Sequence, residues 1–187
     1  MGLLIPLMMS NKKMFQLWLN YVINRAFALF GCPVTSIAEE DCLMKDRILI
    51  VEDEPLLAFD LEDLLHQFGY RVSGIANDLD SAQRLAPYAD VAFVDVNLSD
   101  GQTGPRIGQF LASEFGVAVI FVTGDEAAID RGVAGTLGVI AKPVNATKIK
   151  AALDYLLELQ GGGQPAEPVG MRVFSDTPCI PRRIANF

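Results

Sequence analysis

One stretch constrains the fold more than any other, residues 91–101, which read Val-Ala-Phe-Val-Asp-Val-Asn-Leu-Ser-Asp-Gly. The apolar first half is typical of a central strand buried on both faces, and the polar second half is typical of a loop. Asp95 is therefore expected where a buried strand reaches solvent. In an open parallel α/β sheet, ligands and chemistry collect at the carboxyl ends of the strands. The side chains that share this edge with Asp95 then decide what the chain can do.

A regular alternation surrounds this stretch. The short apolar runs, which we predict as strands, are residues 48–51, 71–76, 91–96, 117–122 and 139–140. Helical spacing of apolar residues follows each run, at 55–68, 79–86, 104–115 and 126–137, and in a last helix marked by Ile149, Leu153, Leu156 and Leu157. Five alternations predict an α/β fold with a five-stranded parallel, doubly wound sheet and right-handed crossovers. The helix over 126–137 is expected to be weak, because Gly132 and Gly135 each cost about 1 kcal/mol in a helix interior.

The regular pattern covers residues 44–160, which we predict as one domain. The composition of residues 161–168, Gly-Gly-Gly-Gln-Pro-Ala-Glu-Pro, is typical of a linker, so residues 161–187 are expected to form a flexible tail. The domain carries 9 basic and 18 acidic side chains. This balance argues against nucleic-acid binding, which needs a basic face to neutralise phosphates.

Residues 1–43 form a separate hydrophobic N-terminal extension, predicted to be helical. Between residues 14 and 34 the segment is nearly all apolar, except for a thin stripe of Gln16, Asn20 and Asn24. Three interpretations stay open. The segment is not part of the native protein, whose natural start would be Met44; or it is a helix docked on the domain or on a partner; or residues 14–34 anchor the protein at a membrane surface.

Cysteine and histidine give no sign of a metal or disulfide site. Cys32, Cys42 and Cys179 all lie outside the predicted domain, without the paired spacing of a zinc or disulfide framework. They are expected to be reduced thiols of a cytoplasmic protein. The single histidine, His66, lies in a helical pattern without a second ligand residue four positions on, which favours a helix surface over a metal site.

The strand ends bring five polar side chains to one edge of the sheet. The first strand delivers Glu52 and Asp53, the third Asp95, the fourth Thr123 and the fifth Lys142. Three carboxylates repel one another unless a cation is present, and an all-oxygen set suits Mg²⁺. A lysine and a hydroxyl aimed at the same point would hold anionic oxygens. Together these residues predict a pocket in which a phosphoryl group is transferred to the Asp95 carboxylate.

Four separated motifs at these strand ends resemble the receiver domain of two-component response regulators, in its stand-alone form. The motifs are Val51-Glu-Asp-Glu-Pro55, Phe93-Val-Asp-Val-Asn-Leu98, Val122-Thr-Gly124 and Ala141-Lys-Pro143. The resemblance implies a flavodoxin-like sheet of order 2-1-3-4-5 and phosphorylation by a sensor histidine kinase or a histidine phosphotransferase. A switch of this kind is expected to bind a downstream protein partner through the fourth helix and fifth strand. Whether it also forms a phosphorylation-dependent homodimer stays open.

The same resemblance implies a role for each site residue. Asp95 corresponds to the phosphoacceptor, Thr123 to the switch hydroxyl and Lys142 to the phosphate-binding lysine, whose bond to Pro143 is commonly cis. The implied Mg²⁺ ligands are Glu52, Asp53, Asp95 and the backbone carbonyl of Asn97. Val139 departs from the family, because it stands where an aromatic switch residue is common.

Two positions near the phosphoacceptor suggest a short-lived phosphoryl state. Asn97 and Asp125 each lie two residues beyond a site residue, where they could position a hydrolytic water. Two other functions compete with a phosphorylated switch. One is a pseudo-receiver that acts as a scaffold without phosphorylation. The other is a Mg²⁺ phosphatase of the haloacid-dehalogenase kind. Those enzymes carry an Asp-x-Asp motif at the end of the first strand. Asp95-Val-Asn97 lacks the second acid and lies on the third strand, which argues against this function.

Overall fold

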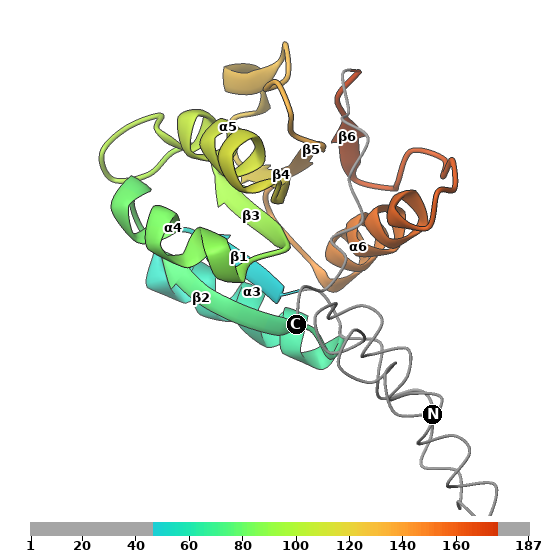
Figure 1. Ribbon diagram of the computed structural model, residues 1–187, viewed down its shortest axis with the longest axis horizontal. Coiled ribbons are helices and arrows are strands. Elements are labelled where there is room, and N and C mark those ends of the chain that lie inside the picture. The colour runs from blue at the N-terminus through green and yellow to red at the C-terminus, as the bar shows by residue number, and fades with distance from the viewer. Residues whose placement is uncertain (1–46, 176–187) are drawn as a thin grey trace, which may run out of the picture. The chain divides into compact units, whose positions relative to one another are not determined.

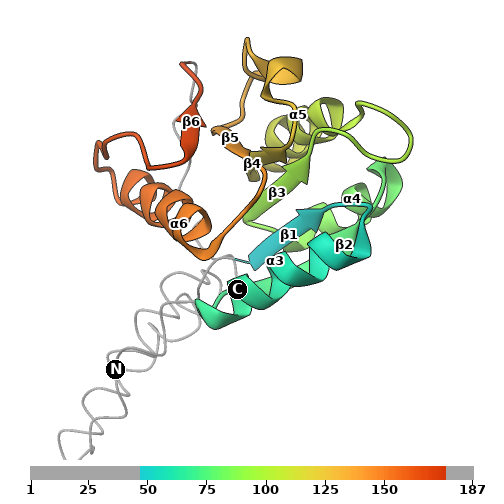
Figure 2. The same cartoon turned by 180° about the vertical axis from the view of Figure 1, so that it is seen from behind.

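The computed structural model describes residues 47–175, which form one sheet covered by helices on both faces (Figures 1 and 2). The strands are β1 (Arg47–Val51), β2 (Arg71–Ala76), β3 (Val91–Asp95), β4 (Ala118–Thr123), β5 (Gly138–Ala141) and β6 (Met171–Val173). Their order is β2-β1-β3-β4-β5-β6. The first five strands are parallel, and β6 is antiparallel to β5. The predicted flavodoxin-like arrangement, 2-1-3-4-5, is confirmed.

Four α-helices and two short 3-10 helices connect the strands of the described region. They are α3 (Pro55–Gln67), α4 (Leu79–Leu85), η2 (Ala86–Tyr88), α5 (Gly104–Phe115), η3 (Glu126–Ile129) and α6 (Ala146–Gln160). Helices α3 and α6 lie on one face of the sheet, and α4 and α5 lie on the other (Figure 1). The apolar side chains of each pair belong to a separate core cluster. Because β3 and β4 have helices on both faces, every residue of these two strands is buried. This burial explains their unbroken apolar runs.

Local signals set most helix boundaries where the sequence predicts them. Pro55 occupies the first turn of α3, where its missing N–H is not needed. Asp78 caps α4 by accepting a hydrogen bond from the Ser81 N–H at 2.7 Å. Gly116 ends α5 in the left-handed conformation, with φ of 64°.

The predicted helix over residues 126–137 is wrong. Only η3, a single 3-10 turn, forms there. Gly132 and Gly135 adopt φ angles of 74° and 80°, in the left-handed region that an α-helix excludes. The glycines therefore prevent the helix instead of only weakening it, and residues 130–137 form two turns and irregular loop.

The predicted flexible tail is also wrong over part of its length, since β6 adds a sixth strand to the sheet. Met171 and Phe174 are buried, and the Phe174 N–H donates to the Leu137 carbonyl at 2.9 Å. Gly138 makes this pairing possible, because a Cβ there would lie 2.3 Å from the Arg172 carbonyl oxygen. The strand is three residues long, which is too short to produce a recognisable period in the sequence.

Several predicted features lie outside the described residues. These are the extension 1–43 with its apolar segment 14–34, and all three cysteines. Across residues 47–175, the helices are too short or too polar to cross a lipid bilayer. His66 is exposed on α3, as predicted.

Candidate functional site

The carboxyl edge of the sheet carries the polar residues that the motifs predict. Asp95 is the last residue of β3 and Thr123 the last of β4, while Glu52 and Lys142 directly follow β1 and β5. Glu52, Asp95 and Thr123 are buried, with 7%, 6% and 0% of their surface exposed. Buried ionised groups need partners, so the contacts of these side chains define the site.

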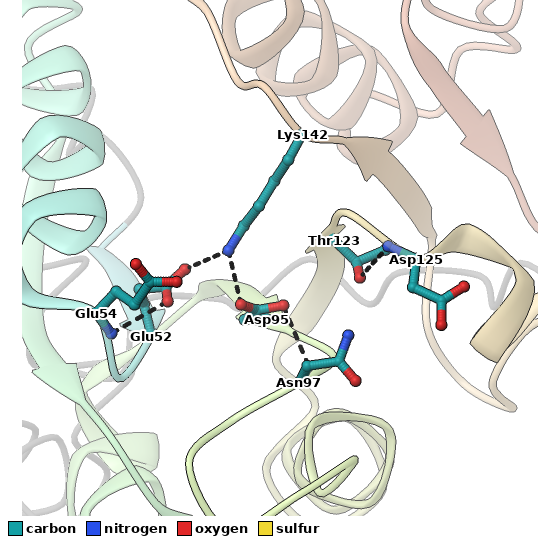
Figure 3. Close-up of polar contacts among 7 residues, drawn as sticks. All are labelled: Glu52, Glu54, Asp95, Asn97, Thr123, Asp125 and Lys142. Atoms are coloured by element: carbon teal, nitrogen blue, oxygen red, sulfur yellow. Dashed lines mark hydrogen bonds and ion pairs between the residues drawn. The ribbon is translucent and has the colours of Figure 1, made fainter.

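Lys142 connects two of the three carboxylates. Its Nζ lies 2.7 Å from Oδ2 of Asp95 and 2.9 Å from Oε2 of Glu52 (Figure 3). The lysine backbone is held as well, because its N–H donates to the Thr123 carbonyl at 2.8 Å. The Lys142-Pro143 peptide bond is cis, as the resemblance predicts.

The pKa values of the bridged residues reflect burial and pairing. Burial raises the pKa of Glu52 above its usual value, although the hydrogen bond from Lys142 opposes the shift. Burial alone would lower the pKa of Lys142, but hydrogen bonds to Asp95 and Glu52 outweigh it, and the pKa is raised. Lys142 is therefore a fixed positive charge at this edge.

One ammonium does not balance the acidic groups around it. Glu52, Asp53 and Asp95 each place a carboxylate oxygen within 4.8 Å of the others. Glu52 and Asp95 are buried, and Asp53 is half-buried. Three close carboxylates with oxygen-only chemistry fit a hard divalent cation such as Mg²⁺ better than a softer metal.

Backbone N–H groups hold the two buried carboxylates from the side away from Lys142. The Asn97 N–H donates to Oδ1 of Asp95 at 3.2 Å, and the Glu54 N–H donates to Oε1 of Glu52 at 3.2 Å (Figure 3). Each carboxylate is thus fixed through both oxygens. This fixation orients Asp95 before any ligand arrives.

Thr123 reaches the expected edge but does not join the cluster. Its hydroxyl accepts a hydrogen bond from the Asp125 N–H at 3.0 Å (Figure 3). No hydrogen bond joins the Thr123 hydroxyl to Asp95 or to the Lys142 ammonium among the contacts of residues 47–175. A threonine at a strand end readily caps the following backbone in this way. The structure therefore brings together Glu52, Asp53, Asp95 and Lys142, with Thr123 beside them.

Gly104 is a residue of the site that the motifs do not reveal. A Cβ at this position would lie 1.9 Å from the Asp95 carbonyl oxygen and 2.7 Å from Cα of Val96. Only glycine therefore lets the start of α5 approach the end of β3 so closely. In the sequence this glycine is only the first residue of a predicted helix, and the close approach comes from long-range packing.

A cavity of about 540 Å³ opens beside the cluster. Its apolar lining includes Leu57, Leu61 and Leu64 of α3 together with Pro143 and Val144. Asp95, Glu52 and Lys142 also line it. The acidic cluster is thus accessible from an apolar depression.

Comparison with known families decides the classification. The sequence profile described as "Response regulator receiver domain" matches residues 48–154. The chain belongs to the response regulator receiver domain family. The resemblance that the four motifs carry is thereby confirmed.

Two curated relatives match this chain over similar lengths. The phyllosphere-induced regulator PhyR of Methylorubrum extorquens is 33% identical over 131 residues, covering 66% of this chain and 48% of PhyR. Protein Rrf1 of Nitratidesulfovibrio vulgaris is 30% identical over 129 residues, covering 67% of this chain and 92% of Rrf1. The chain therefore matches about half the length of PhyR and nearly all of Rrf1.

A solved structure confirms the fold. The solution structure of the receiver domain of PhyR from Erythrobacter litoralis is similar with a TM-score of 0.56 and 26% identity. The match covers 66% of this chain and 96% of that domain. The receiver fold of this chain is thus supported by both sequence and structure.

Proposed function

We propose that this receiver domain accepts a phosphoryl group on Asp95 from a sensor histidine kinase or a histidine phosphotransferase and acts as a response regulator. The observation that carries the proposal is the position of the Lys142 ammonium, 2.7 Å from Asp95 and 2.9 Å from Glu52. An ammonium held beside a buried carboxylate suits an aspartate that becomes an acyl phosphate. Its positive charge is already in place to neutralise the negative charge that the phosphoryl group adds.

The proposed reaction is a phosphoryl transfer between two side chains. A carboxylate oxygen of Asp95 attacks the phosphorus of a phosphohistidine, the P–N bond breaks, and a P–O bond forms. The imidazole leaves with the electron pair of the broken bond. Lys142 then faces a phosphoryl oxygen, while the Asn97 N–H keeps the carboxyl group oriented.

Mg²⁺ is the proposed cofactor, and the acidic cluster fits it. Glu52, Asp53, Asp95 and the backbone carbonyl of Asn97 would hold the ion. When bound, it would supply positive charge to the phosphoryl oxygens. The residues themselves fix the site, because Glu52 and Asp95 are buried and hydrogen-bonded in place.

Thr123 would couple phosphorylation of Asp95 to a conformational change in the rest of the domain. In the proposed switch its hydroxyl leaves the Asp125 N–H and donates to a phosphoryl oxygen. Residues 124–137 directly follow and contain only one 3-10 turn, so they can shift at low cost. Val139 is fully buried and takes the place of an aromatic switch residue, so the change would pass through residues 124–137.

The proposed output is a protein–protein interaction in the cytoplasm. Residues 124–137, together with the β6 strand that covers the edge of β5, would present the surface that changes. The downstream partner, or a second copy in a phosphorylation-dependent homodimer, would bind there. Direct nucleic-acid binding does not fit, because the domain has twice as many acidic as basic side chains over residues 44–160.

The phosphoryl state is proposed to be short-lived and lost by a reaction within the domain. Asn97 and Asp125 lie two residues beyond Asp95 and Thr123 in the sequence, where they would position a water for hydrolysis. The protein would act on its own acyl phosphate and not turn over an external substrate. A phosphoprotein that stays unchanged for hours in Mg²⁺ would contradict this part of the proposal.

Incubation with acetyl phosphate and Mg²⁺, followed by intact mass measurement, tests the proposal. We expect an adduct of about 80 Da that is absent in Asp95→Asn. Turnover of many equivalents of acetyl phosphate would instead support a phosphatase, and absence of any adduct would support a scaffold. Phosphotransfer from candidate kinases, measured with chains that begin at Met1 and at Met44, would then identify the donor.

A further inference from the structure

Lys148, in the first turn of α6, contacts the backbone on both sides of Lys142. Its Nζ donates to the Ala141 carbonyl at 2.8 Å and to the Pro143 carbonyl at 3.0 Å. These two carbonyls flank the residue whose ammonium meets Asp95. One side chain thus holds both ends of the short segment that carries Lys142.

The charge of Lys148 is unfavourable for the helix in which it lies. Asn145 caps α6 and accepts a hydrogen bond from the Lys148 N–H at 3.0 Å, so Lys148 is the third residue of the helix. The helix dipole favours a negative side chain here, and glutamate would complete a capping box. The helix therefore does not stabilise a cation at this position. The charge of Lys148 is stabilised instead by its hydrogen bonds to the two carbonyls.

The C-terminal segment fixes the conformation of the Lys148 side chain. Gly170, just before β6, packs against its methylene groups, and a Cβ there would lie 2.8 Å from Cγ of Lys148. Gly170 also has a φ of 79°, which other residues rarely adopt. Because packing already orders the side chain, little entropy is lost in holding the two hydrogen bonds.

We infer that Lys148 is a positioning residue that sets the place of the Lys142 ammonium by clamping the Ala141 and Pro143 carbonyls. The inference rests on the proposed function for its effect on phosphorylation, but the positioning itself can be measured without any phosphoryl donor. It also gives the C-terminal segment a role, since Gly170 holds the clamp.

The test compares Lys148→Met, which keeps a similar chain without the ammonium, with Lys148→Arg, which can still donate to both carbonyls. Lys150→Met is the matched control, because Lys150 lies on the same helix, is exposed, and pairs only with Asp154 in the contacts of the described chain. The first measurement is the rate at which acetic anhydride labels Lys142 in the full chain without Mg²⁺, read by peptide mass spectrometry. We expect severalfold faster labelling in Lys148→Met and unchanged labelling in the other two variants.

The second measurement is the rate of adduct formation with acetyl phosphate and Mg²⁺. We expect a decrease of about tenfold in Lys148→Met, because small displacements of a positioned group are costly, and recovery in Lys148→Arg. If Lys148→Met does not fold, as judged by circular dichroism, Gly170→Ala displaces the same side chain while keeping its charge, and faster labelling of Lys142 is again expected.

The outcomes separate the inference from the proposed function. Faster labelling of Lys142 in a protein that forms no adduct even as the wild type would support the positioning role and reject phosphorylation. Labelling and adduct formation that match the wild type in Lys148→Met, or in Gly170→Ala if that variant is used, would overturn the inference. An equal decrease in the rate of adduct formation in Lys150→Met would also overturn the inference, because the effect would then come from the loss of positive charge alone.

Discussion

The Lys142 ammonium lies 2.7 Å from Oδ2 of Asp95, although the two residues are 47 positions apart in the chain. Lys142 follows β5 and Asp95 ends β3, with β4 between these strands in the sheet. The contact therefore spans the width of two strand spacings and needs the full length of the lysine side chain. A shorter or uncharged residue at position 142 would leave Asp95 and Glu52 without their shared cation.

Lys142→Met is expected to slow phosphorylation of Asp95 by acetyl phosphate about 100-fold, because one preorganised charge for the phosphoryl oxygens is lost. The measurement is the initial rate of adduct formation by intact mass. Lys150→Met provides the control for loss of a lysine on an exposed surface. A rate within about twofold of wild type would show that Lys142 does not act on the phosphoryl group.

Mg²⁺ is expected to stabilise the folded domain, because the carboxylates of Glu52, Asp53 and Asp95 come together only when the chain folds. At a free concentration of about 100 times Kd, the gain in the free energy of unfolding is about 2.7 kcal/mol. Thermal unfolding with and without Mg²⁺ measures it. The gain should be lost in Asp53→Asn and kept in Asp63→Asn, which changes an exposed acid on α3; equal gains in both variants would contradict the assigned site.

Gly104→Ala is expected to destabilise the domain by about 1–3 kcal/mol, since its Cβ would collide with the Asp95 backbone. The same collision should reduce adduct formation on Asp95. Gly124→Ala is the stability control, because no atom lies within 4 Å of its Cβ position. Its effect should stay within about 0.5 kcal/mol in urea unfolding, and equal effects of the two variants would refute the packing argument.

Phe174→Ala tests whether β6 belongs to the folded domain. Phe174 is buried, and its ring centroid lies 6.3 Å from that of Phe121. Truncating a buried phenylalanine is expected to cost about 3 kcal/mol in the free energy of unfolding. Val169→Ala, at a position that is 77% exposed, should cost little in the same urea titration. A negligible effect of Phe174→Ala would mean that the strand adds nothing to stability.

The stability of the domain is expected to fall at alkaline pH, and Tyr155 contributes to the fall. Burial, with a smaller effect of Glu167, raises the pKa of the Tyr155 phenol above its usual value. The folded state then keeps a proton that the unfolded chain loses, so stability decreases as the pH rises above about 10. The raised pKa of Lys142 acts in the same direction.

Urea unfolding between pH 8 and 11 measures this dependence. Tyr155→Phe should reduce the slope of stability against pH above about 10, and Tyr88→Phe, at an exposed position, should leave it unchanged. An unaltered slope in Tyr155→Phe would rule out the phenol as a source of the effect.

Much of the fold follows from local patterns in the sequence. The apolar runs of β3 and β4 are buried strands, as both-face burial requires, and the glycine and proline positions mark the ends of α3 and α5. The helix predicted over residues 126–137 failed, because the left-handed backbone at Gly132 and Gly135 outweighs the apolar spacing. The strand β6 was missed because three residues carry too little pattern.

The sequence by itself determined the type of sheet, the edge at which chemistry occurs, and the residue types that meet there, since parallel strands bring their carboxyl ends to one side. Tertiary structure alone decided which groups touch. It joined Lys142 to Asp95 and Glu52, turned the Thr123 hydroxyl to the Asp125 N–H, required glycine at position 104, and set Lys148 against the carbonyls beside Lys142. These contacts require distant segments to be positioned relative to one another to within a few tenths of an ångström. Hydrophobic period and residue spacing do not specify positions that closely.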